Sequence, residues 1–153
     1  PERTYFRESM KVSQLIAYFK DFYADFRPER AMQMLNNLQI DPNAPLKTLS
    51  KGTKEKVQLI MVMSRDARLY LLDEPIAGVD PAARDYILRT VISNYNEQAS
   101  IIISTHLITD VENVLDDVVF IRDGRVLLTD TVENIREVKG KSVDQYFREV
   151  FAC

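Results

Sequence analysis

The sequence predicts an α/β protein in which a helical N-terminal part precedes a layer of parallel strands. Three observations predict this class. Apolar residues before residue 66 recur at three- and four-residue intervals, which is typical of amphipathic helices. Two short apolar runs, 69–72 and 100–104, are separated by a segment of helical periodicity. The resulting order of strand, helix, strand and helix favours a parallel sheet.

Composition excludes several classes of protein. Of the 153 residues, 46% are hydrophobic and 28% are charged, which is enough to bury one core. The 20 basic and 23 acidic residues leave a formal net charge of -3, so nothing indicates a general nucleic-acid or anionic-membrane binder. The longest apolar stretches are far shorter than the roughly 20 residues of a membrane span. The single cysteine, Cys153, excludes an internal disulfide.

Three helices are predicted before Asp66. The first covers Val12–Phe26, where apolar residues follow a helical spacing and a proline soon ends the pattern. The second covers Glu29–Leu38 and is followed by a loop that contains two prolines. The third begins at Ser50, whose hydroxyl can accept a backbone hydrogen bond, and ends near Asp66. The first part of the chain is therefore a helical lobe.

Strands and helices alternate after that lobe. Leu69–Leu72 is predicted to be a buried strand that ends at two acids. A helix from Pro81 to about Asn96 follows a capping aspartate, and Ser100–Ser104 is a second buried strand. A further helix is expected over 107–115. The chain closes with a hairpin and two small helices, predicted at 118–122, 125–129, 132–138 and 143–150.

The sharpest chemical signal is the acid pair Asp73 and Glu74, directly after the first strand. Adjacent carboxylates at the carboxyl end of a buried strand are costly unless a cation or a proton transfer uses them. At a phosphate-binding site, Asp73 would hold a water of the Mg²⁺ shell and Glu74 would accept a proton from the attacking water. The alternative is a strand end that is simply exposed to solvent.

Two other features have both a chemical and a structural interpretation. The segment 49–53 joins a hydroxyl and a glycine at a helix start, where free N–H groups and the helix dipole favour phosphate. Taken alone, it is better interpreted as a plain helix cap. His106 follows the second strand at the sheet edge that carries the acids, but a lone histidine is more often structural. The lysines Lys51, Lys54 and Lys56 are consistent with a solvated helix face.

The order and spacing of these features resemble the nucleotide-binding domain of the ATP-binding cassette (ABC) family. The segment 49–53, LSKGT, resembles the signature loop usually written LSGGQ, with a lysine and a threonine at two of its positions. Residues 69–74 resemble the Walker B strand with its catalytic glutamate, 77–80 resemble the D-loop, and His106 resembles the switch histidine. The resemblance covers essentially the whole chain.

The resemblance implies a partial P-loop NTPase (RecA-like) core with parallel strands plus an ABC helical subdomain. Residues 1–66 would form the helical subdomain, 67–130 the carboxyl-terminal part of the ATPase core, and 131–153 a helical tail. The phosphate loop G-x-x-x-x-G-K-[ST], called Walker A, occurs nowhere in the sequence. Because that loop normally holds the β and γ phosphates, we expect a carboxyl-terminal fragment that is inactive as an ATPase by itself.

The resemblance also implies roles for single residues. Asp73 would support Mg²⁺ through a water, Glu74 would polarise the attacking water, and His106 would contact the terminal phosphate of ATP. Ser50 and Gly52, with Lys51 between them, would complete the ATP site of an opposing domain.

The resemblance further implies that Asp80 lies at the interface between the two domains. Two such domains sandwich two ATP molecules, so hydrolysis would require a dimer, and the cofactors would be ATP and Mg²⁺.

The function implied is that of the ATPase subunit of an ABC transporter, located in the cytoplasm and peripheral on the cytoplasmic face of the cell membrane. Its partners would be a second nucleotide-binding domain, in a homo- or heterodimer, and an integral membrane permease subunit. No nucleic acid is expected. The short tail after Thr131 favours export over sugar import. The alternatives are a soluble ABC ATPase of translation or DNA repair and a non-enzymatic docking module.

Overall fold

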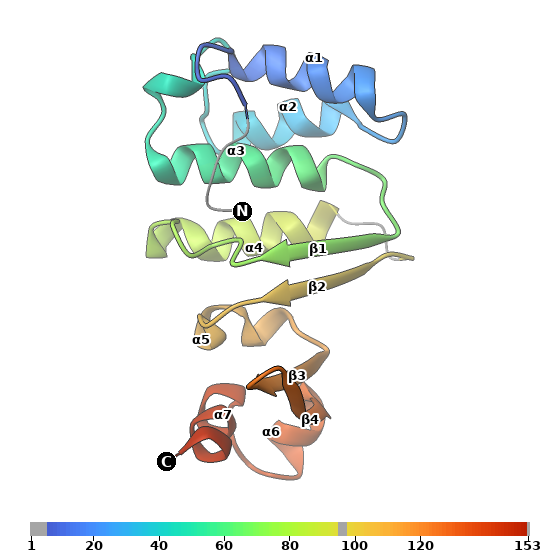
Figure 1. Cartoon of the computed structure of the whole chain (residues 1–153), viewed down its shortest axis with the longest axis vertical. Coiled ribbons are helices and arrows are strands. Elements are labelled where there is room, and N and C mark those ends of the chain that lie inside the picture. Colours follow the sequence, from blue (N-terminus) through green and yellow to red (C-terminus); the bar gives the residue numbers. More distant parts are fainter. Residues whose placement is uncertain (1–5, 95–97, 153) are drawn as a thin grey trace. The chain divides into compact units, whose positions relative to one another are not determined.

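A computed structural model of the chain describes residues 6–94 and 98–152, and Figure 1 shows its helices and strands. The chain divides into two compact units, Pro1–Thr105 and His106–Cys153. The first unit combines helices with a parallel strand pair, which confirms the predicted α/β class. The predicted subdomain boundaries at 66/67 and 130/131 stay predictions, because the compact units divide at a different place, between Thr105 and His106.

Three helices open the first unit. They are α1 (Val12–Phe22), α2 (Pro28–Asn37) and α3 (Lys51–Met63), with a short 3-10 turn, η1 (Leu46–Thr48), before α3. Figure 1 shows α3 between the pair α1 and α2 on one side and α4 on the other, in agreement with the contacts of α3 with all three. Their buried side chains form the core of the unit: Val12, Leu15, Ile16, Ala31, Met34, Leu35, Val57, Ile60 and Met61.

The first helix is four residues shorter than predicted, because it ends at Phe22 instead of Phe26. Phe26 is nevertheless buried. A turn brings it back to the core: its amide donates to the Tyr23 carbonyl at 3.0 Å, and the Arg27 amide donates to the Ser64 carbonyl at 2.7 Å. The apolar spacing of Phe26 therefore reflects its burial and not a continuing helix.

The parallel strand pair consists of β1 (Leu69–Asp73) and β2 (Ser100–Ser104), with Asp73 opposite Ser104. The predicted strands and their parallel pairing are confirmed. The prediction that both strands are buried is wrong, since Tyr70 is 2% exposed whereas Leu71 is 68% exposed. The period of two along a strand puts neighbouring side chains on opposite faces, and only one face turns to the core.

The helix α4 (Pro81–Asn94) connects the two strands. Asp80 caps its start as predicted, because its Oδ1 accepts a hydrogen bond from the Ala83 amide at 3.0 Å. The predicted end near Asn96 lies outside the described residues. Within the part of the chain that the structure describes, no helix combines the length and the apolar character that crossing a bilayer requires.

The second unit is built on a β-hairpin. Asp123 and Gly124 at its turn have φ angles of 51° and 73°, the left-handed pair that a two-residue type I′ turn needs, so the predicted hairpin is confirmed. The prediction of one helix over 107–115 is wrong: a four-residue α-helix is followed there by a 3-10 turn. The elements are α5 (Ile108–Val111), η2 (Glu112–Val114), β3 (Asp117–Arg122), β4 (Arg125–Thr131), α6 (Val132–Glu137) and α7 (Val143–Phe151).

A partly buried polar cluster joins the end of β4 to α6 and α7. Lys139 Nζ lies 2.6 Å from Asp130 Oδ2 and 2.8 Å from Tyr146 Oη, and Asn134 donates to Asp130 Oδ1 at 2.7 Å. The hydrogen bond from Lys139, followed by that from Asn134, holds the pKa of Asp130 below its ordinary value of 3.8. The hydrogen bond to Asp130 likewise raises the pKa of Lys139 above 10.5.

These directions predict how the second unit responds to acid. Because the folded pKa of Asp130 is depressed, its contribution to stability is complete above pH 3.8 and is lost as the pH falls through the lower folded value. Urea unfolding at a series of acidic pH values should show this loss in the parent. In Asp130→Asn, the free energy of unfolding should fall less steeply as the pH is lowered. Asp123→Asn, whose side chain is 92% exposed at the turn, should follow the parent. Equal slopes for all three proteins would contradict the assignment.

Candidate functional site

The carboxyl ends of β1 and β2 bring four oxygen-bearing side chains together. Ser104 Oγ donates a hydrogen bond to Asp73 Oδ1, and Thr105 Oγ1 donates to Glu74 Oε2 at 3.2 Å. The Glu74 amide also donates to the Ser104 carbonyl at 2.9 Å, which extends the parallel ladder by one bond. The parallel register places each hydroxyl beside an acid, because Asp73 lies opposite Ser104. The sequence interpretation did not assign these two hydroxyls, although their position directly after a second apolar run is the signal that could have found them.

The backbone turns sharply at Glu74. Its φ of 45° lies in the left-handed region, which residues other than glycine rarely adopt. The Ala77 amide donates to the Glu74 carbonyl at 3.3 Å and closes the turn. The strand therefore stops at Asp73, and Glu74 is half-buried whereas Asp73 is exposed. A non-glycine residue in this conformation at a sheet edge is typical of a functional position.

The donor set at this edge fits Mg²⁺ bound through few protein ligands. Carboxylate and hydroxyl oxygens are the groups that Mg²⁺ prefers, and it usually keeps several waters and substrate phosphates in its shell. Among the described residues, no three or more His, Cys, Asp or Glu side chains are grouped so that they could enclose a metal ion. Asp73 is exposed and sits beside the Ser104 hydroxyl, so it can support an ion through water.

His106 follows Thr105 directly and is the first residue of the second unit. Its side chain is exposed. The predicted contact between His106 and a terminal phosphate stays a prediction.

The start of α3 has the geometry of a helix cap. Ser50 Oγ accepts a hydrogen bond from the Thr53 amide at 3.1 Å and lies 2.8 Å from Thr53 Oγ1. The capping prediction for Ser50 is confirmed. The Lys51 side chain is 78% exposed, with Nζ 4.0 Å from Glu55 Oε1. The phosphate-binding roles of Ser50, Lys51 and Gly52 stay predictions.

A groove of about 260 Å³ lies between α3 and the end of β1 within the first unit. Lys51 and the acids Asp73 and Glu74 therefore line the same groove. The residues that line it come from α3, from β1 and from the segment after β1: Lys51, Glu55, Gln58, Leu59, Val62, Leu71, Leu72, Asp73, Glu74, Pro75, Ala77 and Gly78.

Gly52 lets the backbone of the following loop approach α3. A Cβ atom at Gly52 would lie 2.9 Å from the Gly78 carbonyl oxygen, closer than side chains tolerate. The sequence interpretation considered Gly52 only as part of a helix start that favours phosphate. Its packing against Gly78 is a second reason for glycine at this position, and only the three-dimensional structure reveals it.

This packing predicts that Gly52→Ala destabilises the first unit. The methyl group would press on a backbone oxygen, which cannot move aside as a side chain does, and the cost of overpacking exceeds what alanine gains in a helix. We expect a net loss of about 1–2 kcal/mol in urea unfolding. Lys51→Ala, in the same turn but exposed, should change stability by less than about 0.5 kcal/mol. A Gly52→Ala variant as stable as its parent would show that α3 has room for the methyl group.

Comparisons with known proteins agree with this geometry. A family model described as "AAA domain, putative AbiEii toxin, Type IV TA system" matches residues 12–109. The "ABC transporter ATP-binding protein YtrB" of Bacillus subtilis (strain 168) is 25% identical over 138 residues, covering 90% of this chain and 47% of that protein. The "ABC-type transporter ATP-binding protein EcsA" of the same organism is 30% identical over 104 residues, covering 66% of this chain and 42% of that protein. The chain thus spans about half the length of the curated relatives it matches.

Solved structures share the fold. One described as "Structure of ATP binding subunit of ABC transporter" superposes with a TM-score of 0.81 at 26% identity, covering 98% of this chain and 66% of that chain. A second, an ATP-binding cassette of an ABC transporter, gives a TM-score of 0.72 and covers 100% of this chain and 67% of that chain. At 21% identity, this second structure supports the fold alone.

The fold, with Asp73 and Glu74 at the end of β1 in its parallel strand pair, defines the class: it matches part of a P-loop NTPase fold with a helical subdomain. The family model covers more than half of the chain, so the chain belongs to the AAA domain family that this model describes, and the relatives and the solved structure that it resembles are ATP-binding proteins of ABC transporters.

Proposed function

We propose that this chain forms the part of an ABC transporter ATPase subunit that contains the signature loop and the catalytic glutamate. ATP binding and hydrolysis in a nucleotide-sandwiched dimer would drive transport through a separate membrane subunit. The observation that carries the proposal is the pairing of Asp73 and Glu74 with the hydroxyls of Ser104 and Thr105 at the edge of the parallel strands.

Each acid of the pair has a distinct chemical task. Glu74 would orient the attacking water and accept its proton, and the Thr105 hydroxyl on Oε2 would hold the carboxylate in place for that transfer. Asp73 would hold a water of the Mg²⁺ shell, and when bound, Mg²⁺ would neutralise charge on the β and γ phosphates. His106 would contact the terminal phosphate.

The signature segment would act on the site of an opposing domain. Ser50 and Gly52, with Lys51 between them, would meet the phosphates of the ATP bound by that domain, and Asp80 would lie at the interface. The start of a helix favours negative charge, which supports this role. The exposed side chains of Leu71 and Ile102, at 68% and 58%, support association of the sheet with further protein.

The partner in the membrane would be an integral permease subunit, bound by the helical subdomain at residues 1–66. Exposed aromatic side chains on α1, Tyr18 at 43% and Phe22 at 67%, support a docking role for this lobe. The subunit would work at the cytoplasmic face of the cell membrane.

The test is ATP binding and hydrolysis with Mg²⁺, measured for the full-length protein and for residues 1–153 alone. We expect the full-length protein to turn over ATP and the shorter chain to be inactive, since its sequence has no Walker A pattern. A full-length protein that binds no nucleotide would overturn the ATPase function and leave a docking module as the conclusion.

A further inference from the structure

Lys56 does not lie on a solvated face of α3, and the interpretation that it does is wrong. Its side chain is only 18% exposed. It lines a small apolar hollow together with Met34, Met63 and Ile87, which belong to three different helices. Its ammonium group reaches Asp80, with Nζ 3.3 Å from Oδ2. A long stem over apolar side chains and a charged end on a carboxylate are typical of a lysine that joins two structural elements.

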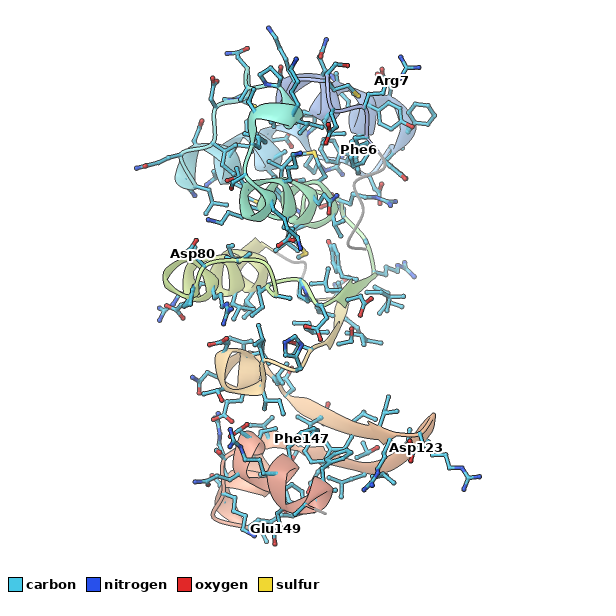
Figure 2. The ribbon with its side chains drawn as sticks, turned by 60° about the vertical axis from the view of Figure 1, so that its left-hand side comes forward. Phe6, Arg7, Asp80, Asp123, Phe147 and Glu149 are labelled. Atoms are coloured by element: carbon cyan, nitrogen blue, oxygen red, sulfur yellow. The ribbon has the colours of Figure 1, made fainter. Side chains whose placement is uncertain are left out.

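Asp80 uses both of its carboxylate oxygens. Oδ2 accepts from Lys56, and Oδ1 accepts from the Ala83 amide at the start of α4. Partial burial raises the pKa of Asp80, but the hydrogen bonds from Lys56 and Ala83 outweigh it and hold this pKa below 3.8. Figure 2 shows Asp80 at the start of α4, at the end of the loop 77–80. The Asp80 carboxylate therefore fixes the end of the loop 77–80 to both α3 and α4.

Two further contacts join the same loop to the same face of α3. A Cβ atom at Gly78 would lie 1.8 Å from Glu55 Oε2, and one at Gly52 would lie 2.9 Å from the Gly78 carbonyl oxygen. Gly52, Glu55 and Lys56 are spaced i, i+3 and i+4, so they share one face of the helix. The loop therefore lies along the first two turns of α3 and meets this face at three positions.

We propose that Lys56 is a positioning residue that locks the loop 77–80 to α3, so that the signature segment and the D-loop of this chain form one rigid piece. The part of the proposal that concerns catalysis rests on the proposed function. Because the spacing between the signature segment and the D-loop is fixed, one ATP-dependent closure of the dimer brings both segments to the opposing domain. The conformational entropy of ordering each segment separately is then not lost at that step.

Lys54, which does not lie on a solvated face either, offers a matched control on the same helix. Its side chain is 21% exposed, and its Nζ lies 3.2 Å from Glu8 Oε1. Lys54 and Lys56 thus have the same charge, nearly the same burial and ion pairs of nearly the same length. They differ in what they hold, because Lys54 contacts the segment before α1 and Lys56 contacts the loop.

The first readout is amide hydrogen exchange in the full-length protein, followed in a peptide that covers residues 76–83. The Val79 and Ala83 amides are hydrogen-bonded in this segment, at 3.2 Å to the Ile76 carbonyl and 3.0 Å to Asp80 Oδ1. Lys56→Met should raise the exchange rate of the segment about tenfold, because it frees the loop from α3. Lys54→Met should leave the rate unchanged, and Lys56→Arg should restore it to within about twofold of the parent.

The second readout is steady-state ATP hydrolysis. Lys56→Met should lower kcat about tenfold and change KM for ATP by less than about twofold, because Lys56 orients the loop without being a ligand of the nucleotide. Lys54→Met should keep the parent kcat, and Lys56→Arg should recover most of the lost rate.

The outcomes distinguish a failure of the Lys56 proposal from a failure of the proposed ATPase function. Unchanged exchange in Lys56→Met would overturn the lock, whether or not the protein hydrolyses ATP. Raised exchange with an unchanged kcat would overturn the positioning role. A parent protein without any hydrolysis would overturn the proposed function, and the exchange rates would still decide whether Lys56 holds the loop.

Discussion

Replacing Glu74 by glutamine is expected to lower the ATP turnover of the full-length protein by about 10²- to 10⁴-fold, the usual worth of a general base. Glutamine keeps the shape of the side chain and can still accept the hydrogen bond that Thr105 donates to Oε2. It cannot accept a proton from the attacking water. ATP binding should therefore persist, and an ATP-bound dimer should accumulate.

Phosphate release measures the first effect, and light scattering with bound nucleotide measures the second. Glu137→Gln, an equivalent change at an exposed position on α6, should leave both quantities unchanged. If Glu74→Gln hydrolysed ATP at the parent rate, Glu74 would have no role as the base. The site would then need another proton acceptor.

Replacing Phe120 by alanine is expected to destabilise the second unit by about 3–5 kcal/mol. The Phe120 side chain is 5% exposed on β3, and its ring centroid lies 5.8 Å from Tyr146, 5.3 Å from Phe147 and 5.9 Å from Phe151. Figure 2 shows Phe147 on α7, the helix that carries all three partners. The expected loss is comparable with the whole stability of so small a unit, at about 0.05–0.15 kcal/mol per residue.

Val119→Ala is the matched control for this change. Val119 neighbours Phe120 on β3, but its side chain points to the opposite face and is 52% exposed. Its replacement should cost less than about 1 kcal/mol. Urea unfolding followed by circular dichroism, together with hydrogen exchange of α7, distinguishes the two variants. Equal losses would show that the contacts of Phe120 with α7 do not hold the unit together.

Local signals in the sequence were enough for many elements. The hairpin at Asp123-Gly124 and the cap at Ser50 depend on backbone preferences of the residues themselves, and both are present in the structure. Pro28 opens α2 for a similar reason, because its missing amide hydrogen is not needed in the first turn. Periodicity found the longer helices and the apolar runs marked the parallel strands. It could not separate Phe26 from the end of α1, and it predicted one helix over 107–115 where α5 and a 3-10 turn lie.

Part of the candidate site was predicted from the sequence, and part of it was not. The acids Asp73 and Glu74 were predicted because two charges beside an apolar run are costly without a task. Their hydroxyl partners were not predicted, because Ser104 and Thr105 lie 31 residues further along the chain and meet the acids only through strand pairing.

The sequence by itself determined the order of most elements, the family resemblance and the candidate residues for the chemistry, because these depend on residue type and on short spacings. Only the tertiary structure decided which face of β1 is covered, why Gly52 must lack a side chain, and that Lys56 pairs with Asp80. These features join positions that are far apart in the chain. They exist only after the backbone has folded, and a spacing along the sequence carries no information about them.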